Sequence, residues 1–546
     1  MYRQILARFS GRERVMFHIL ALLVLVAISV FFYSLTYGDK TVGYLSDDAI
    51  YLLMAEIFSP WRHSTDLLLE FLRTDNHFPP LYPVMLGLFG ANSHSPVLAS
   101  AVTTAFLIIA VAVYGIWIYI ESGRPILAVT LPVMFSLLPG TIIFTQGLWS
   151  EFLFMCFFYG ALALVANKTL TGSHWLACSL FIALTALTRA VGISFIAAYC
   201  LFLILKRPRY YLLHMLVAAL PFLYWVFFIN INATDHGYFG ILLNALASDQ
   251  GHAAGLFHDV LAKLANIYDA WLWQFLISDI HGGAGMFARY FLVILLAAAV
   301  TGFGHRLVRM QLDALCLVFY GITVLVWPFS DLNFVSRFLF PVTPLMLFYV
   351  FYAIGLIEHK TWYRRAISLV FWGGIIITVW PSTSYLIDRA YAAAPSDLAP
   401  YRHDRAWFYS KDLDSAIASA KGSKDLFHAL NRVATIVPEN ECIFSFQTAL
   451  VMLYAHRISG MYPSPSVSND EFAYATRGCR YMVALPLTSI NNDFPKFYPL
   501  RRVINDPSYT IIPIMPDNKE EKKPVLYLIR RITGSRTTSR PPHPVH

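Results

Sequence analysis

The chain has 546 residues, of which 57% are hydrophobic and 14% are charged, and its formal net charge is +8. A soluble domain carries about 25% charged and about 45–50% apolar residues, so this composition excludes a mainly water-soluble protein. Most lysines and arginines stand in short breaks between apolar runs, where they act as orientation signals. The positive charge therefore does not indicate a nucleic-acid partner, and we expect none.

Apolar runs follow one another along most of the chain, at 15–36, 95–120, 126–139, 150–166, 175–205, 210–230, 287–304, 311–328, 336–355 and 364–382. The run at 175–205 is too long for one span, and the basic breaks alternate between the two sides only if it is a hairpin that turns at Arg189. The sequence therefore predicts a polytopic α-helical membrane protein with about eleven transmembrane helices. Its N-terminus is expected in the cytoplasm.

The composition changes after Pro381. A polar helical stretch at 411–437 and short β-like runs at 442–446, 481–485 and 525–529 predict a small α/β domain on the extracytoplasmic side. We expect a transmembrane domain at 1–384, the soluble domain at 385–531 and a disordered tail at 532–546. Cys442 and Cys479 both lie in the soluble domain, where an oxidising compartment would allow a disulfide, but their spacing alone does not decide it.

Ionisable residues gather at the predicted outer ends of the spans, where charges usually face a wet cavity or a partner. They are Asp47, Asp48, His77, Glu151, Arg189, Arg289, Asp331 and Arg337. Each has a simpler interpretation as well. The arginines are also suited to anchoring a span end, Glu151 to pairing with Arg189, and Ser46-Asp47-Asp48 to capping a helix.

Five ordered motifs resemble the GT-C glycosyltransferases, in particular the protein O-mannosyltransferases and the lipid A aminoarabinose transferases. The motifs are Ser46-Asp47-Asp48-Ala49-Ile50-Tyr51, His77-Phe78-Pro79-Pro80-Leu81-Tyr82, Ser150-Glu151, Leu187-Thr188-Arg189, and Ser336-Arg337-Phe338 with Pro341 and Pro344. The chain departs from the family pattern in three places. Asp48 stands where relatives often carry Glu, Arg189 where many carry Lys, and Phe338 where Tyr is more usual.

The resemblance implies transfer of a sugar from a polyprenyl-phosphate donor to a glycan, lipid or protein acceptor, among membrane lipids on the outer face. Asp47 is then the expected base, with Asp48 and Glu151 also in the catalytic set. Tyr51, His77, Tyr82, Arg189 and Arg337 are the expected substrate-binding residues, and the arginines suit a leaving phosphate. A divalent cation is a candidate cofactor, although no metal-ligand cage is evident, and no organic cofactor is expected. The expected location is a bacterial inner membrane.

Two other functions compete with the transferase. A lipid-linked sugar transporter or flippase would also place charges at span ends, but such proteins tend to carry repeats, and none is seen here. A non-catalytic membrane protein whose outer domain binds a partner is the second alternative. In that case the acidic residues would be replaceable without loss of function.

Overall fold

A computed structural model describes residues 11–532 apart from 37, 39–41, 44–46, 62–64, 66–67, 70–77, 168–170, 231–252, 278–283, 328–331, 358–360, 394, 403–406, 409, 411, 464, 488–493 and 517–522. The chain divides into two compact units. The helical unit holds 1–37, 77–82 and 98–392, and the mixed unit holds 38–76, 83–97 and 393–546. Helix α5 (Leu81–Leu88) begins in the first and ends in the second.

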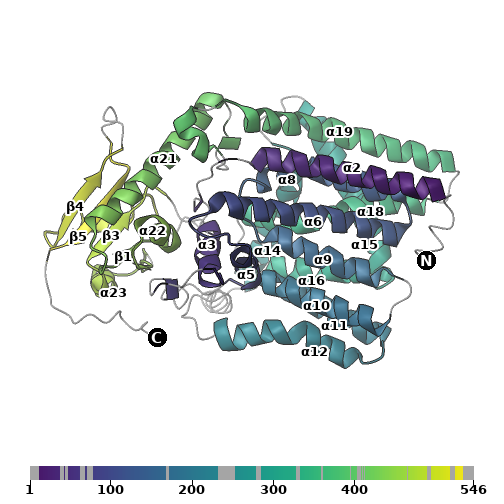
Figure 1. The fold of residues 1–546 in the computed structure, drawn as a ribbon, viewed down its shortest axis with the longest axis horizontal. Coiled ribbons are helices and arrows are strands. Elements are labelled where there is room, and N and C mark those ends of the chain that lie inside the picture. The colour runs from purple at the N-terminus through teal and green to yellow at the C-terminus, as the bar shows by residue number, and fades with distance from the viewer. Residues whose placement is uncertain are drawn as a thin grey trace. The chain divides into compact units, whose positions relative to one another are not determined.

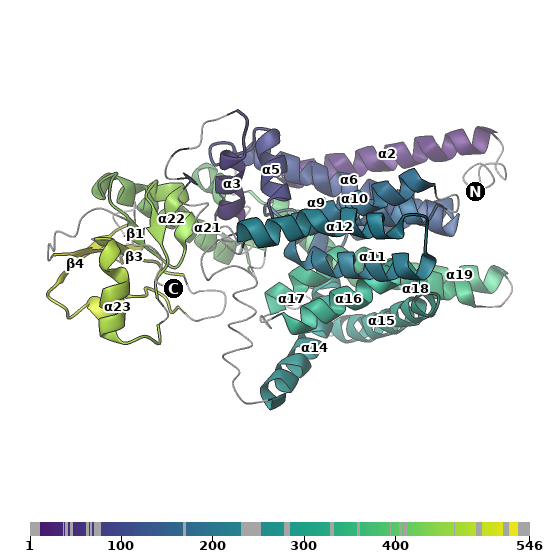
Figure 2. The same ribbon diagram turned by 90° about the horizontal axis from the view of Figure 1, so that it is seen from below.

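The helical unit consists of helices joined mostly by short turns. In chain order they are α2 (Gly11–Thr36), α6 (Pro96–Ser122), α7 (Pro125–Ser136), α8 (Pro139–Phe144), α9 (Glu151–Val165), α10 (Gly172–Thr188), η1 (Ala190–Gly192), α11 (Ile193–Lys206), α12 (Tyr211–Tyr224), η2 (Trp225–Asn230), α14 (Ala253–Phe275), α15 (Ala284–Val308), α16 (Leu312–Val326), α17 (Leu332–Leu339), η4 (Phe340–Val342), α18 (Thr343–Leu356) and α19 (Thr361–Tyr391). Figure 1 and Figure 2 both show α9, α10, α11 and α12 alongside one another.

Five of the described helices are long and apolar enough to cross a membrane. They are Val15–Thr36, Pro96–Ser122, Gly285–Val308, Phe334–Leu356 and Trp362–Tyr391, and six shorter apolar helices of 10–17 residues accompany them. Large apolar side chains point outward along several of them, for example Leu22, Leu23, Leu216 and Ile294, which are 55–62% exposed. So much exposed apolar surface is unfavourable in water and is what contact with lipid requires. The protein is an integral membrane protein, while the number of eleven spans stays a prediction.

The long apolar run at 175–205 forms two helices, as predicted. Helix α10 ends at Thr188, and Arg189 has an extended backbone (φ −147°, ψ 137°) that breaks the helix before η1 and α11. The break places a charged side chain at the ends of two helices instead of in the middle of one.

A small mixed sheet lies near the C-terminus, within the mixed unit. In the described residues its order is β2-β1-β3-β5-β4, formed by β1 (Ile443–Phe444), β2 (Ser459–Gly460), β3 (Tyr481–Ala484), β4 (Tyr509–Ile514) and β5 (Leu526–Arg531). Strand β1 runs parallel to β2 and β3, with Ile443 opposite Ser459 and Tyr481. Strand β5 is antiparallel to both β3 and β4. Three of these strands follow the predicted β-like runs, whereas β2 and β4 were not predicted.

The other elements of this unit are α3 (Asp47–Ile57), η5 (Ser396–Tyr401), α21 (Leu413–Ile436), α22 (Thr448–Ala455), α23 (Asn469–Ala475), η6 (Thr476–Gly478) and α24 (Leu500–Val503). Helix α21 runs along the sheet (Figure 1) and contributes Leu426, Leu430 and Val433 to one core with Val483 and Leu528 of the strands. Asp412 caps α21, because its side chain accepts the Ser415 N–H at 2.7 Å.

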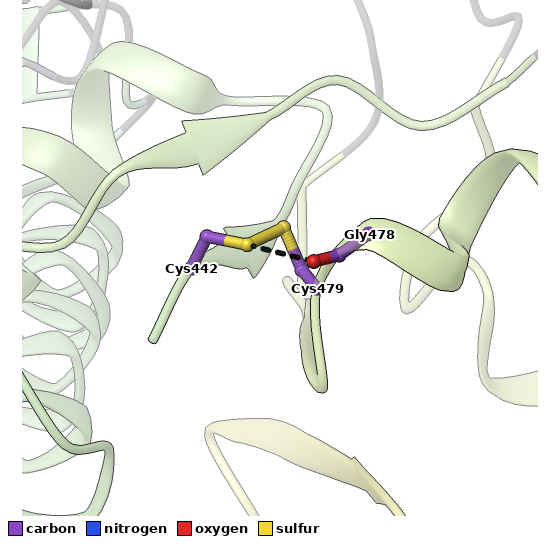
Figure 3. Close-up of a disulfide and its surroundings, with 3 residues drawn as sticks. All are labelled: Cys442, Gly478 and Cys479. Atoms are coloured by element: carbon purple, nitrogen blue, oxygen red, sulfur yellow. Dashed lines mark hydrogen bonds between the residues drawn. A yellow bond between two sulfur atoms is a disulfide. The ribbon is translucent and has the colours of Figure 1, made fainter. Parts of the chain in front are cut away.

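Cys442 and Cys479 form a disulfide with 5.1 Å between their Cα atoms (Figure 3). It ties the residue before β1 to the residue that follows η6. The Cys442 sulfur also lies 3.5 Å from the Gly478 carbonyl oxygen, which is a close contact because a disulfide sulfur has no hydrogen to donate.

The two units divide the chain at Ala392, a few residues beyond the boundary predicted after 384. They also assign the first outer loop, at 38–76 and 83–97, to the same unit as the C-terminal residues. We predicted that loop as part of the transmembrane domain. The predicted tail at 532–546 lies outside the described residues, except for Ile532.

Candidate active site

The Asp47–Asp48 pair begins helix α3. Both acidic side chains stand in its first turn, where the helix dipole favours negative charge. Asp48 is 6% exposed, and its carboxylate accepts the N–H of Gly43 at 3.0 Å and that of Ala49 at 2.9 Å. Burial raises the pKa of Asp48 to about 6, against the lowering effect of these backbone N–H groups and with a small rise from the neighbouring Asp47. Asp47 is half-buried and so remains accessible.

The other predicted binding residues of the first outer loop have different surroundings. Tyr51 lies on α3, one turn after Asp47, and is 2% exposed. Tyr82 is completely buried, and its hydroxyl shares a 2.7 Å hydrogen bond with the Thr103 hydroxyl. Its ring also packs edge-on against Phe106. His77 lies outside the described residues. The binding roles of these three residues stay predictions.

Glu151, Arg189 and Arg337 meet in the helical unit, although they come from three separate motifs. Glu151 is the first residue of α9 and is completely buried. One of its carboxylate oxygens forms an ion pair with Arg189, which follows α10, and with Arg337 on α17. Its other oxygen accepts a 3.4 Å hydrogen bond from the Ser150 hydroxyl. We call Glu151, Arg189 and Arg337 the arginine cluster.

Aromatic rings flank both guanidinium groups of the arginine cluster. The Arg337 guanidinium carbon lies 4.5 Å from the ring centre of Trp149, and that of Arg189 lies 5.7 Å from the ring centre of Phe338. The face of an aromatic ring attracts a cation and holds a planar guanidinium in one orientation. Sequence reasoning missed Trp149, although it directly precedes Ser150-Glu151.

The arginine cluster is built from two cationic side chains and one anionic side chain. Two guanidinium groups share one carboxylate, and the side chains of Arg189 and Arg337 are only 10% and 15% exposed. Arginine stays protonated even when buried, and a guanidinium presents five N–H donors. Such a cluster can bind a further anion, and the planar guanidinium is well matched to carboxylate or phosphate.

The alternative that Glu151 simply pairs with Arg189 is therefore correct in part, because the pair exists but includes Arg337 as well. The structure brings Glu151, Arg189 and Arg337 together, and it places Asp47, Asp48 and Tyr51 on the first two turns of α3. In the described part of the chain, His, Cys, Asp and Glu residues do not gather in groups of three or more that would hold a metal ion. The divalent cation stays a prediction.

Comparison with known proteins gives similarity only at the level of structure. No family model matches the chain, and no curated protein matches its sequence. The crystal structure of ArnT from Cupriavidus metallidurans bound to undecaprenyl phosphate has a TM-score of 0.48 and 12% identity, and the match covers 97% of this chain and 100% of that one.

The archaeal oligosaccharyltransferase AglB from Archaeoglobus fulgidus, in complex with an inhibitory peptide and a dolichol-phosphate, has a TM-score of 0.49 and 14% identity. That match covers 87% of this chain and 70% of AglB.

Proposed function

We propose that the protein is a membrane glycosyltransferase that moves a sugar from a polyprenyl-phosphate donor to a hydroxyl or phosphate acceptor on the extracytoplasmic face. The observation that carries the proposal is the arginine cluster, in which two guanidinium groups share the one buried carboxylate of Glu151. A lipid phosphate that leaves the sugar develops negative charge, and preorganised guanidinium groups stabilise such charge in a site of low dielectric. The donor class is the one that the motif resemblance implies.

The proposed reaction is a direct displacement that inverts the anomeric centre. The acceptor oxygen attacks the anomeric carbon of the sugar, and the bond from that carbon to the phosphate oxygen breaks. The electron pair of that bond leaves with the polyprenyl phosphate, beside Arg189 and Arg337. A hydroxyl acceptor loses its proton to the carboxylate of Asp47, the general base. A phosphate acceptor is already ionised and needs no base.

Glu151 is proposed to orient the two arginines, because a carboxylate that accepts from both of them fixes where their remaining N–H donors point. Asp48 is proposed to support Asp47 through the first turn of α3. A divalent cation near the acidic residues would supply further positive charge for the leaving phosphate. The sugar is a hexose or a pentose. Residues other than those named here select the sugar and the acceptor.

The proposed orientation places the N-terminus in the cytoplasm and residues 393–532 outside it, in a bacterial inner membrane. The disulfide between Cys442 and Cys479 supports this side for the C-terminal residues, because disulfides persist in oxidising compartments and are rare in the cytosol. The basic breaks between the apolar runs support the same orientation.

The test measures free polyprenyl phosphate released from a panel of polyprenyl-phosphate sugars by the purified protein in lipid. Wild type is expected to consume at least one donor, and Asp47→Asn is expected to lose the activity for a hydroxyl acceptor. Asp414→Asn is the matched control, since Asp414 also lies in the first turn of a helix but is exposed on α21.

The proposal fails if wild type releases no polyprenyl phosphate from any donor, or if Asp47→Asn turns over as fast as Asp414→Asn with a hydroxyl acceptor. Movement of intact lipid-linked sugar across vesicles, with the sugar–phosphate bond preserved, would instead support the transporter or flippase alternative. Retention of all function without the acidic residues would support a non-catalytic protein.

A further inference from the structure

Helix α22 holds the backbone that precedes the Asp47–Asp48 pair. The Tyr454 hydroxyl donates to the Val42 carbonyl oxygen at 2.5 Å and accepts the Val42 N–H at 3.3 Å. One side chain thus engages both backbone groups of a residue 412 positions earlier in the chain. The Tyr454 ring is fixed in turn against Phe427 of α21, with 4.6 Å between the ring centres.

Gly43, the next residue, lies between α22 and Asp48. Its φ of +110° lies in the region that favours glycine. A Cβ atom at this position would stand 3.0 Å from Leu450 Cδ1 and 3.4 Å from both Leu453 and Tyr454, so α22 packs directly on the Gly43 backbone. The Gly43 N–H donates to Asp48 Oδ2 at 3.0 Å. A continuous path of contacts therefore leads from Tyr454 through Val42 and Gly43 to Asp48.

The hydrogen bond from Gly43 matters because Asp48 is buried. Desolvation disfavours its charged form, and the N–H groups of Gly43 and Ala49 oppose this effect. Among the described residues, the other charged or titratable groups that act on Asp48 are Asp47 on its own helix and Tyr454 on α22. A change in the position of Gly43 would weaken the stabilisation of the Asp48 carboxylate and would disturb the turn that carries Asp47.

We propose that Tyr454 is a positioning residue for the Asp47–Asp48 pair, acting through the backbone of Val42 and Gly43. The C-terminal part of the chain then serves as a scaffold that fixes the base, in addition to any contact with an acceptor. This inference rests on the proposed function, since it assigns Tyr454 an effect on the same transfer reaction.

The first experiment compares Tyr454→Phe with Tyr462→Phe. Both changes remove one tyrosine hydroxyl from the same unit, and the Tyr462 hydroxyl also donates to a backbone carbonyl, that of Val483 at 3.0 Å. The Tyr462 bond lies in the sheet core, where its acceptor is Val483 of β3. Tyr454→Phe is expected to lower kcat by about 10-fold to about 100-fold, as a small misplacement of a reacting group does, with the donor KM unchanged.

The pH profile separates positioning from general damage. A displaced Gly43 N–H no longer favours the charged form of Asp48, so the acid limb that reports ionisation of the Asp47–Asp48 pair should move to higher pH in Tyr454→Phe. The Tyr462→Phe profile should keep the wild-type shape. Equal kcat values and identical acid limbs for the two variants would overturn the proposal.

The second experiment does not depend on activity and measures amide hydrogen exchange at Val42, Gly43 and Ala49. Tyr454→Phe should exchange faster than wild type and Tyr462→Phe at these three amides, because their acceptors are lost or displaced. Gly43→Ala should accelerate exchange at Ala49 in the same way. If wild type consumes no donor but exchange changes as expected, the proposed function fails while the positioning contact stands. If amide exchange is unchanged in both Tyr454→Phe and Gly43→Ala, the positioning role is overturned.

Discussion

Two clusters of charged side chains lie at opposite ends of α9. The first has two arginines and one carboxylate, and the second has one arginine and two carboxylates. At the first residue of α9, Glu151 is shared by Arg189 and Arg337. At the other end, a cavity of about 520 Å³ is lined by Leu162 and Val165 of α9 together with Glu121, Arg306 and Asp313. There one guanidinium is shared by two carboxylates. We call Glu121, Arg306 and Asp313 the acidic cluster.

The N–H donors of Arg306 are well matched to the carboxylates of Asp313 and Glu121. Its Nε and Nη2 donate to the two Asp313 oxygens at 2.7 Å each, and its Nη1 donates to Glu121 at 2.7 Å. The Tyr349 hydroxyl also donates to Asp313, at 2.9 Å. This bidentate geometry connects α6, α15, α16 and α18, as expected of a structural tie. The arginine cluster instead holds two guanidinium groups around one carboxylate, a composition that suits an anion-binding site.

The largest effect is expected from Arg306→Gln, which leaves the buried Asp313 and the partly buried Glu121 without their guanidinium. Removal of one partner from a buried ion pair typically costs about 3–5 kcal/mol, because the remaining charge is uncompensated. The thermal midpoint of the purified protein should fall strongly. Arg309→Gln is the control, because Arg309 follows on the same segment but is exposed. Equal midpoints for the two variants would contradict the structural role of the acidic cluster.

The next effect is expected from Arg337→Gln, and it should appear in activity instead of stability. Glu151 keeps Arg189 as its ion-pair partner, so its buried carboxylate still has a counter-ion. Loss of one donor to a developing oxyanion costs about 100-fold to about 1000-fold in kcat. Arg337→Lys keeps the charge but not the planar guanidinium, and should fall between wild type and Arg337→Gln. A normal kcat in Arg337→Gln would remove the functional difference between the two clusters.

Asp48 is a third buried charge, and its carboxylate is paired with backbone N–H groups instead of a guanidinium. Its pKa is raised from 3.8 to about 6, which corresponds to about 3 kcal/mol between its two protonation states. The folded protein therefore binds this proton more tightly than the unfolded chain does. The contribution of Asp48 to stability is highest below pH 3.8, decreases as the pH rises to about 6, and is constant above that value.

Asp48→Asn should consequently be more stable than wild type at neutral pH. The gain is smaller than 3 kcal/mol, because the amide replaces one acceptor oxygen, and about 2 kcal/mol is expected. Thermal midpoints of the two proteins between pH 4 and pH 8 measure the effect. Their difference should grow with pH and level off above about pH 6. A difference that does not depend on pH would show that Asp48 is not the group that titrates.

The sequence predicts the helical unit well, because apolar runs and basic breaks report directly on contact with lipid and water. The break at Arg189 follows from run length and charge alone, and the structure has it at that residue. The meeting of Glu151, Arg189 and Arg337 was expected only in part, because it depends on how α9, α10 and α17 pack. Periodicity within one helix contains no information about that packing.

The mixed unit was harder to predict. Strand β2 has only two residues, and β4 contains Pro513, which weakens its strand signal. The assignment of 38–76 to the same unit as the C-terminal residues depends on contacts such as Tyr454 with Val42, far apart in the chain. Gly43 was the available signal, since glycine is the default residue where the backbone must take a positive φ. The catalytic and binding roles of Asp47 and Asp48 stay predictions.

The smallest effect is expected from Phe338→Leu, which removes the ring that faces Arg189 at 5.7 Å. A cation–π contact of this kind contributes about 0.5–1 kcal/mol, so kcat/KM should fall by about 2-fold to about 5-fold. Phe338→Tyr keeps the ring and introduces the residue more usual in the GT-C proteins that the motif resembles, and should retain full activity.

Phe348→Leu is the counterpart in the acidic cluster, where the Phe348 ring faces Arg306 at 5.4 Å. It should lower the thermal midpoint and leave kcat/KM unchanged. If both leucine variants lower kcat/KM equally, the rings act through general packing and the distinction between a binding cluster and a structural cluster is wrong.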